Sequence, residues 1–404
     1  MATLKETVVH APTIVLWQFL RVLFSLLPIR KKTILLEGNK SYDDNARGIY
    51  ENLILRKLNL DYQITWFVED PAKFSYLSKK ENVNVSEYRS WRMGLRGVSS
   101  LVSFIYNNCT AEYCLYSNCS LGLRLFKGQH RVYLTHGIAL KNLNGALTRL
   151  DGLEMIVSPS DFTSGLINKA MPGAEKITKV LGLPRNDMLF RKDANSIRFL
   201  SQFGECKKII WMPTFKRNVT NIGSRQRNDF SQDTAKDVSL LTEEFMGRLN
   251  KELADMNILL CVKFHPFQNL DYIDFYNLSN IVSLSREDIE DNRICLYSFI
   301  AEFDAMISDY SSVVYDYLLL DKPLAFDLTD YASYAEGRGF SVEDPIEYMP
   351  GKKIRSEDDF IAFVRDVAEG VDNYQSDRER TSRLFNAYFD NQSAQRVLDS
   401  LGIV

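Results

Sequence analysis

The sequence predicts an α/β protein of two domains, each built on a parallel sheet covered by helices. The chain has 404 residues, whereas single hydrophobic cores stop growing at about 250–300 residues. After residue 33, short β-rich runs alternate with amphipathic helical patterns, which is typical of βαβ units. Hydrophobic residues make up 45% and charged residues 25% of the chain, and this ordinary globular composition excludes a disordered or multi-span membrane protein.

The first expected element is an amphipathic helix over residues 14–29. This run is apolar except for Gln18, Arg21 and Ser25, whose spacing puts them on one face of a helix. A helix of this length reaches roughly 24 Å, short of a bilayer core of about 30 Å, and no signal-peptide cleavage site follows it. We therefore expect a helix in the membrane interface, with basic residues 30–32 near anionic headgroups. The alternative is a first helix packed on the protein's own core.

The strands expected after this helix are short and apolar. They are 33–36, 63–68, 112–116, 131–134, 154–157, 209–211, 258–262, 305–307 and 324–326. We expect the domain joint near Gly182-Leu183-Pro184. This joint divides the chain into an interfacial helix with a basic segment (1–32), a first domain (33–184) and a second domain (185–404). Ligands of open parallel sheets bind beyond the carboxyl ends of the strands.

Two of the four histidines follow predicted strands. His136 precedes Gly137 at the end of RVYLT, and His265 comes just after the strand ILLCVKF. A strand-end imidazole facing a cleft can hold or release a proton near neutral pH. One such histidine is more often structural, but two in different halves of the chain favour a functional interpretation. Lys141 has two interpretations. Its charge contributes to the same cleft as His136, or its side chain lies on a solvent-exposed face without a function there.

A third candidate site is SDYSS at 308–312, between a predicted strand and the helical run VVYDYLLL. Free backbone N–H groups and the helix dipole favour phosphate at such a helix start. Ser and Asp are also preferred as simple helix caps, so both interpretations stay open. Asp316, one turn into this helix, is placed to reach a ribose hydroxyl or to face solvent.

Several functional classes are excluded by what the sequence lacks. The formal charge of −3 shows no overall excess of basic residues of the kind that nucleic-acid-binding proteins carry. The six cysteines include no CxxC pair, which argues against a zinc ribbon or a disulfide scaffold and favours reduced thiols in the cytoplasm. P-loop, dinucleotide-binding, zincin and α/β-hydrolase motifs do not occur. No carboxylate triad with metal-ligand spacing is visible, so no metal is expected.

Three separated motifs resemble the CDP-glycerol:glycerophosphate glycerophosphotransferases, the family that builds teichoic acids and related capsule polymers. They are KGQHRVYLTHGIALKNL at 127–143, KFHP at 263–266 and SDYSSVVYDYLLLDKPLAF at 308–326. Supporting matches are SYDDNARGIYENL at 41–53, GLPRND at 182–187, MPTFKR at 212–217 and DYASYAEGRGF at 330–340. The ordered set covers nearly the whole chain after residue 33.

The resemblance implies two facing Rossmann-like domains of the GT-B type, with a CDP-alditol donor held mainly by the second. It implies transfer of glycerol phosphate from CDP-glycerol to a hydroxyl of a polyprenyl-linked glycan, with release of CMP. His136 fits the base, and His265 with Lys263 fits a phosphate clamp. The remaining donor-side candidates are Thr214, Arg217, Asp309, Ser311, Ser312 and Asp316. No metal is required, because lysine, histidine and helix amides can neutralise the phosphates.

Two departures from the family pattern concern these motifs. Ile138-Ala139 replaces the usual Thr-Pro, and Lys263 replaces the usual Arg, which keeps the charge but loses the planar fork. They favour a changed acceptor or sugar alcohol. The alternatives are a CDP-ribitol donor, another nucleotide-sugar glycosyltransferase, or a catalytically dead binding module. The resemblance implies a peripheral protein at the cytoplasmic face of the cell membrane, with no nucleic-acid partner.

Overall fold

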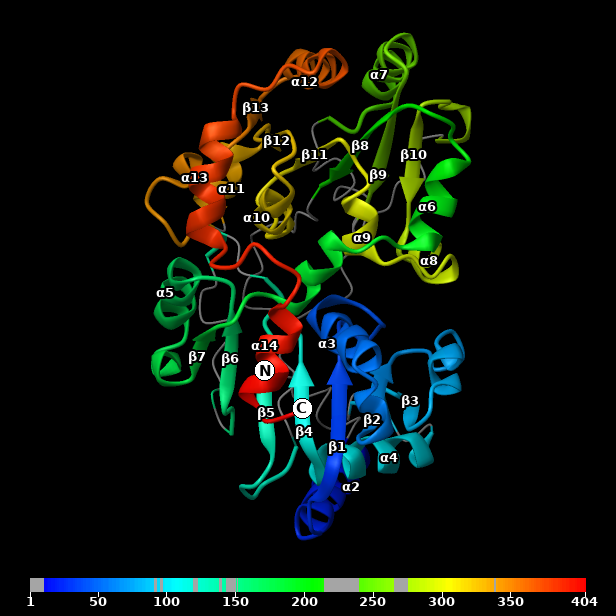
Figure 1. Ribbon diagram of the computed structural model, residues 1–404, viewed down its shortest axis with the longest axis vertical. Coiled ribbons are helices and arrows are strands. Elements are labelled where there is room, and N and C mark those ends of the chain that lie inside the picture. The colour runs from blue at the N-terminus through cyan, green and yellow to red at the C-terminus, as the bar shows by residue number, and fades with distance from the viewer. Residues whose placement is uncertain are drawn as a thin grey trace. The chain divides into compact units, whose positions relative to one another are not determined.

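The computed structural model contains two compact units, each with its own parallel sheet (Figure 1). Unit 1 comprises Met1–His136, Asn144–Asp187 and Asp390–Val404, and unit 2 comprises Gly137–Leu143 and Met188–Phe389. The residues that the structure describes are 11–90, 93–94, 97–118, 123–137, 140–142, 150, 152–213, 240–264, 275–337 and 339–404.

In the described part of unit 1, seven parallel strands have the order β3-β2-β1-β4-β5-β6-β7. They are β1 Arg30–Glu37, β2 Gln63–Val68, β3 Val83–Glu87, β4 Ala111–Tyr116, β5 His130–Tyr133, β6 Met155–Ser158 and β7 Thr178–Val180. The strand order reverses between β1 and β4. Ligands of doubly wound sheets bind at such a switch point.

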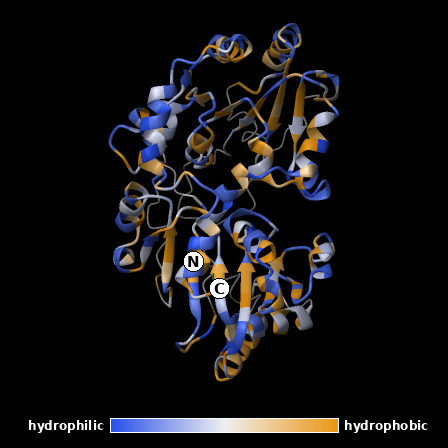
Figure 2. Ribbon diagram, viewed as in Figure 1, coloured by the Kyte–Doolittle hydropathy of each residue, from blue (hydrophilic) through white to orange (hydrophobic). Residues whose placement is uncertain are grey.

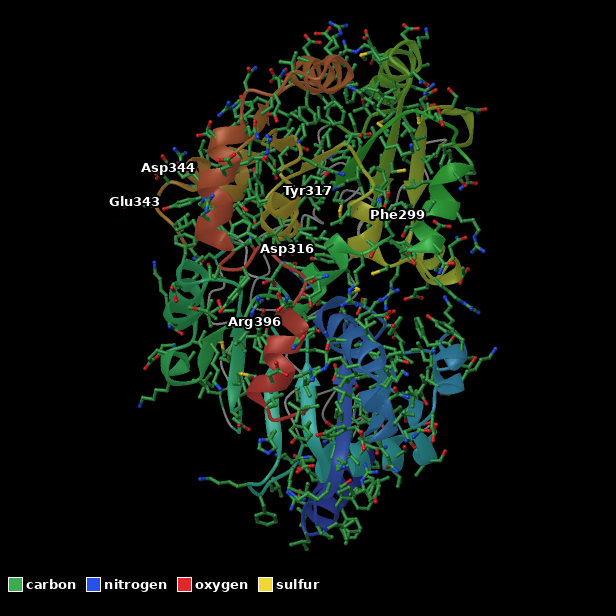
Figure 3. The ribbon with its side chains drawn as sticks, viewed as in Figure 1. Phe299, Asp316, Tyr317, Glu343, Asp344 and Arg396 are labelled. Carbon is green, nitrogen blue, oxygen red and sulfur yellow. The ribbon has the colours of Figure 1, made fainter. Side chains whose placement is uncertain are left out.

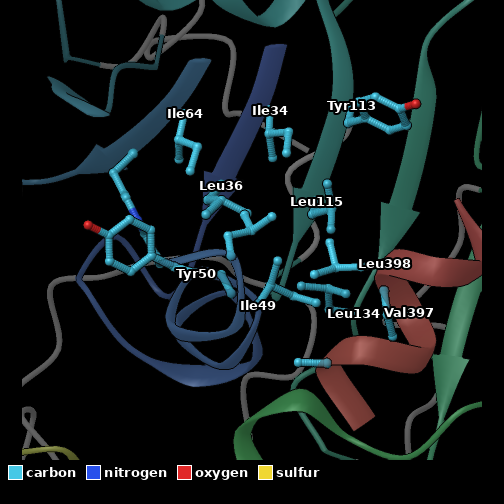
Figure 4. Close-up of a cluster of buried hydrophobic side chains, with 14 of the residues drawn as sticks. Ile34, Leu36, Ile49, Tyr50, Ile64, Tyr113, Leu115, Leu134, Val397 and Leu398 are labelled. Carbon is cyan, nitrogen blue, oxygen red and sulfur yellow. The ribbon is translucent and has the colours of Figure 1, made fainter. Parts of the chain in front are cut away.

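Helices cover both faces of this sheet. They are α2 Ala11–Ser25, α3 Asp44–Leu55, α4 Val98–Thr110, α5 Asp161–Ala170 and α14 Ser393–Ser400, with 3-10 turns at Leu58–Leu60, Ser75–Lys79, Ala174–Lys176 and Pro184–Phe190. Successive strand residues point to opposite faces, so Ile34 and Leu36 pack with α3 and α14, whereas Leu35 packs with α2 and α4. Figure 4 shows the first of these layers, where Val397 and Leu398 of α14 lie near Leu134.

Six parallel strands in the described part of unit 2 have the order β10-β9-β8-β11-β12-β13. They are β8 Lys207–Met212, β9 Ile258–Lys263, β10 Ile281–Leu284, β11 Ala305–Ser308, β12 Leu324–Asp327 and β13 Lys352–Ile354. The helices are α6 Ala194–Ser201, α7 Glu243–Asp255, α8 Arg286–Asp291, α9 Leu296–Ile300, α10 Val313–Tyr317, α11 Tyr331–Gly337, α12 Glu357–Glu369 and α13 Gln375–Phe385. The described residues of this unit also form 3-10 turns at Phe275–Asn277, Leu318–Leu320 and Pro345–Tyr348. Trp211, Phe245 and Phe360 join the sheet to α7 and α12.

The two parallel sheets confirm the predicted α/β class. Each predicted strand lies within three residues of an observed one, although β1 begins at Arg30 rather than Thr33. The prediction missed four of the described strands, β3, β7, β10 and β13, and these are the edge strands of the two sheets. Edge strands are short and only partly covered, so they lack the continuous apolar run of a strand buried on both faces.

The N-terminal helix α2 packs one face on its own unit, as the alternative interpretation expected. Trp17 and Leu20 are buried against α4. Two of its three central polar residues also face inward, whereas Gln18 is exposed. The Arg21 Nε donates to the Leu123 carbonyl at 2.6 Å, and the Ser25 hydroxyl accepts from the Leu125 N–H at 3.1 Å. No helix in the described residues is long and apolar enough to cross a membrane.

Candidate functional site

His136 lies just beyond the carboxyl end of β5, with its imidazole 56% exposed. Its Nδ1 is hydrogen-bonded to Oδ2 of Asp44, the first residue of α3. The Asp44 side chain is only 5% exposed. Because the carboxylate engages Nδ1, the Nε2 atom is the ring nitrogen that can exchange a proton with a ligand.

Arg185 joins the two residues from a distant part of the chain. Its Nη1 donates to Asp44 Oδ1 at 2.8 Å and to the His136 carbonyl oxygen at 3.0 Å. Burial acts to raise the pKa of the Asp44 carboxyl, but the charges and hydrogen bonds of His136 and Arg185 hold it well below its usual range. The Asp44 charge in turn raises the pKa of His136, against the effects of burial and of Arg185. The site therefore contains a carboxylate that stays ionised at neutral pH.

Asn45 ties the backbone around these residues. Its side-chain amide donates to the carbonyls of Leu134 and Thr135 at 3.2 and 3.0 Å, and its Oδ1 accepts from the Arg185 N–H at 3.1 Å. Asn45 has no exposed surface. One buried side chain thus connects the start of α3, the end of β5 and the turn that carries Arg185.

In unit 2, the SDYSS segment follows β11, as predicted, and leads into α10. The Ser308 hydroxyl donates to the Met212 carbonyl at 2.6 Å, and Asp309 is buried. Ser311 and Ser312 are half-buried. Ser312 directly precedes α10, and in the described residues its side chain makes no capping hydrogen bond.

Asp316 lies inside unit 2 rather than on its surface. The carboxylate is buried and accepts a hydrogen bond of 2.7 Å from the Tyr297 hydroxyl. Figure 3 labels Asp316 and Tyr317 on α10 and Phe299 on α9. The solvent-facing alternative for Asp316 is therefore wrong.

The segment that follows His136 in sequence is anchored within unit 2. The Asn142 N–H donates to the Gly339 carbonyl at 3.1 Å, and the Ser341 N–H donates to the Leu140 carbonyl at 2.7 Å. Phe340, which pairs with Lys141, packs on Tyr310 of the SDYSS segment with 5.3 Å between ring centroids. Parts of the HGIALK, SDYSS and GRGF motifs, far apart in sequence, thus lie together.

Lys263 is the last residue of β9, at the carboxyl end of the second sheet. It lies two strands from β11, whose last residue begins the SDYSS segment. Thr214, Arg217 and His265 lie outside the described residues. No group of three or more His, Cys, Asp or Glu side chains in the described residues could hold a metal ion.

The sequence interpretation named His136 but missed Asp44, Asn45 and Arg185. The sequence carries a signal for these residues, because they lie in the segments 41–53 and 182–187, which resemble the family. An Asp-Asp-Asn run just after a central strand places carboxylates at the sheet edge where ligands bind.

A family model described as CDP-Glycerol:Poly(glycerophosphate) glycerophosphotransferase matches residues 19–402. The chain belongs to this family. The predicted family is thereby confirmed, and the motifs that carried the resemblance belong to a match over almost the entire chain.

Relatives in the family include polymerases of both alditol phosphates. The chain is 25% identical to the teichoic acid poly(ribitol-phosphate) polymerase of Bacillus spizizenii over 96% of its length, which is 58% of that protein. It is also 25% identical to the teichoic acid poly(glycerol phosphate) polymerase of Staphylococcus epidermidis over 80% of its length, 44% of that protein. The chain therefore spans about half the length of these two relatives.

The fold of this family member is also similar to a solved one. The wall teichoic acid polymerase TagF superposes with a TM-score of 0.73 and 20% identity, over 98% of this chain and 96% of that one. The two parallel sheets of this chain are therefore GT-B-like, as expected from the resemblance.

Proposed function

We propose that this protein transfers glycerol phosphate from CDP-glycerol to a hydroxyl of a lipid-linked teichoic-acid or capsule-type acceptor, releasing CMP. The observation that carries the proposal is the exposed His136 imidazole, held through Nδ1 by buried Asp44, in a member of this family. That arrangement is suited to a general base.

The reaction follows from the chemistry of a nucleoside diphosphate donor. The acceptor oxygen attacks the phosphorus that carries the glycerol, and a new P–O bond forms. The bond from that phosphorus to the bridging oxygen breaks, and CMP leaves with the bridging oxygen. The proton of the acceptor hydroxyl passes to His136 Nε2. Cations and N–H donors at the pyrophosphate stabilise the charge that develops on the leaving group.

We assign the donor side to the predicted domain 185–404 and the acceptor side to 33–184, except that residues 185–187 and 390–404 belong to unit 1 and residues 137–143 belong to unit 2. Lys263, Ser311 and Ser312 are at strand and helix ends that suit phosphate oxygens. The other proposed donor-side residues are Thr214, Arg217, His265, Asp309 and Asp316. A ribose contact by Asp316 would require its hydrogen bond with Tyr297 to open. No metal is required in this proposal.

CMP release from CDP-glycerol tests the proposal, with CDP-ribitol and UDP-glucose in parallel and a lipid-linked or synthetic glycerophosphate acceptor. We expect release from CDP-glycerol, because the matched family model carries that donor. Release from CDP-ribitol alone would keep the mechanism and change the polymer, as relatives of both kinds allow. Release with none of these donors would contradict the proposal.

We further propose that α2 holds the protein peripherally at the cytoplasmic face of the cell membrane. The outward face of the helix is largely apolar and includes Phe19, which is 62% exposed, and Leu26, which follows directly after the helix, is 68% exposed. Figure 2 shows α2 as largely hydrophobic, and the basic residues 30–32 follow it. An apolar helix face beside basic residues suits anionic headgroups, where a polyprenyl-linked acceptor would be concentrated.

Replacing Phe19 and Leu26 by glutamate is expected to release the protein from anionic vesicles in a flotation assay. Both side chains point away from the core, so the variant should unfold at the same temperature as the unchanged protein. The matched control replaces Leu55 and Leu60, exposed by 67% and 55% elsewhere on unit 1, in the same way. Equal flotation of both double variants would contradict the assignment to α2.

A further inference from the structure

We infer that Asp44, held in place by Arg185 and Asn45, is a positioning residue that fixes the orientation and tautomer of His136. This inference rests on the proposed function, in which His136 accepts the proton of the acceptor hydroxyl. It gives a role to two family segments, 41–53 and 182–187, that the sequence alone leaves without one.

The burial contrast between the two partners is the first argument. The Asp44 side chain is buried, whereas that of His136 is more than half exposed. The buried carboxylate therefore holds an imidazole that remains accessible to substrate. An ionised carboxylate only accepts hydrogen bonds, and therefore Nδ1 carries the hydrogen and Nε2 carries the lone pair. The wrong tautomer would present an N–H to the substrate hydroxyl and could not take its proton.

The carboxylate itself is held at both oxygens. Oδ2 accepts from His136, and Oδ1 accepts from Arg185. The same Arg185 nitrogen also donates to the His136 carbonyl, so one buried guanidinium fixes the backbone of the histidine and the anion that orients its ring. A carboxylate held in this way cannot rotate without losing a charge-assisted hydrogen bond.

Backbone strain at two of these positions is the second argument. Thr135 has φ +60° and Asp44 has φ +58°, in the left-handed region that residues with a side chain rarely adopt. Thr135 is β-branched and fully buried, and its Oγ1 has no hydrogen-bond partner among the described residues. The Asn45 amide donates to the carbonyls of Leu134 and Thr135, which belong to the two peptide groups on either side of the Thr135 Cα. The local sequence does not favour this conformation, so the surrounding network must maintain it.

The electrostatics predict that the two side chains holding His136 act on its titration in opposite directions. Among the described residues, the charged groups with the largest effect on the pKa of His136 are Asp44, Arg185 and Asp43. Asp44 and Asp43 raise the pKa of His136, and Arg185 lowers it. Neutralising Asp44 and neutralising Arg185 should therefore move the imidazole titration in opposite directions.

The chain supplies a matched control on the same strand. His130 at the start of β5 pairs with Glu154 through Nδ1 at 2.6 Å, and both side chains are exposed. This second histidine–carboxylate pair is at the opposite end of β5 from His136. Glu154→Gln thus removes one carboxylate from one histidine in unit 1 without touching the proposed site.

The experiment compares Asp44→Asn, Arg185→Gln and Glu154→Gln in the full chain. Ring C–H resonances of the four histidines, assigned with histidine variants, are titrated by NMR, and kcat and KM for CMP release are measured against pH. Asp44→Asn should lower the pKa of His136, because the charge that raises it is removed, and should lower kcat by about 100-fold or more, with KM for CDP-glycerol within a few-fold. Arg185→Gln should raise the pKa of His136. Glu154→Gln should change neither the pKa of His136 nor the rate of CMP release.

The outcomes separate this inference from the proposed function. If His136 titrates in Asp44→Asn as it does in the unchanged protein, the inference is overturned, even where His136→Ala is inactive. If His136→Ala remains active, the proposed base is wrong. The His136 titration measured by NMR in Asp44→Asn still tests whether Asp44 holds the ring. Should Asp44→Asn fail to fold, the sign of the shift in Arg185→Gln decides the inference alone.

Discussion

Replacement of His136 by alanine is expected to abolish CMP release while binding of CDP-glycerol stays within a few-fold. The variant removes the only atom proposed to accept the acceptor proton, and a positioned base contributes about 10²- to 10⁴-fold to such a rate. Donor affinity should persist, because the proposed phosphate ligands, among them Lys263 and Ser311, lie in unit 2. CMP release and calorimetry with CDP-glycerol measure the two quantities.

The pH dependence of the unchanged protein provides the control for this prediction. His136 must be neutral to act as a base, and its pKa is raised by Asp44. Activity should therefore fall as pH decreases through a value above about 6.5, the ordinary imidazole pKa. The His130→Ala variant should show the same fall in activity at low pH and a nearly normal rate of CMP release. An unchanged rate in His136→Ala would refute the assignment of the base.

A Gly48→Ala substitution is expected to destabilise unit 1 and to reduce activity together. Gly48 lies inside α3, and an added Cβ would collide with the Pro184 carbonyl and lie 2.8 Å from the Arg185 nitrogen. These are backbone atoms, so α3 and the turn with Arg185 must separate. Overpacking of this kind costs about 1–3 kcal/mol of unfolding free energy. The separation would also pull Arg185 from Asp44.

The matched control is Gly165→Ala in α5 of the same unit. No atom lies within 4 Å of the Cβ that this change adds. Alanine is favoured over glycine inside a helix by about 0.5–1 kcal/mol, so this variant should be slightly more stable and fully active. Chemical denaturation and CMP release measure both effects. Equal shifts of the same sign in the two variants would contradict the close packing of α3 on Pro184.

Much of the sheet architecture could be predicted because interior strands carry their own signal. A run such as QITWFV at β2 is apolar because both of its faces are covered. The edge strand β3, with the sequence VNVSE, has polar residues where it is uncovered, and no local rule separates it from a loop. His136 could be predicted for a similar reason, since a scarce residue follows an obvious strand.

The partners of His136 could not be predicted in this way. Arg185 reaches Asp44 across 141 residues, and neither residue differs locally from an ordinary helix-start acid or a surface arginine. The same limit applies to α2. Its apolar and polar positions are evident in the sequence, but the sequence does not show that Arg21 and Ser25 face inward. Periodicity indicates that a helix has two faces, but neighbouring elements decide which face is buried.

The sequence by itself determined the fold class, the interior strands, the family and the strand-end histidine, because each depends on short-range pattern or on motif order. Only the tertiary structure decided which carboxylate holds the imidazole, which face of α2 is exposed, and why Gly48 and Gly165 differ. These depend on contacts between segments far apart in the chain. Such contacts arise only when close packing brings those segments together, and local residue preferences carry no information about them.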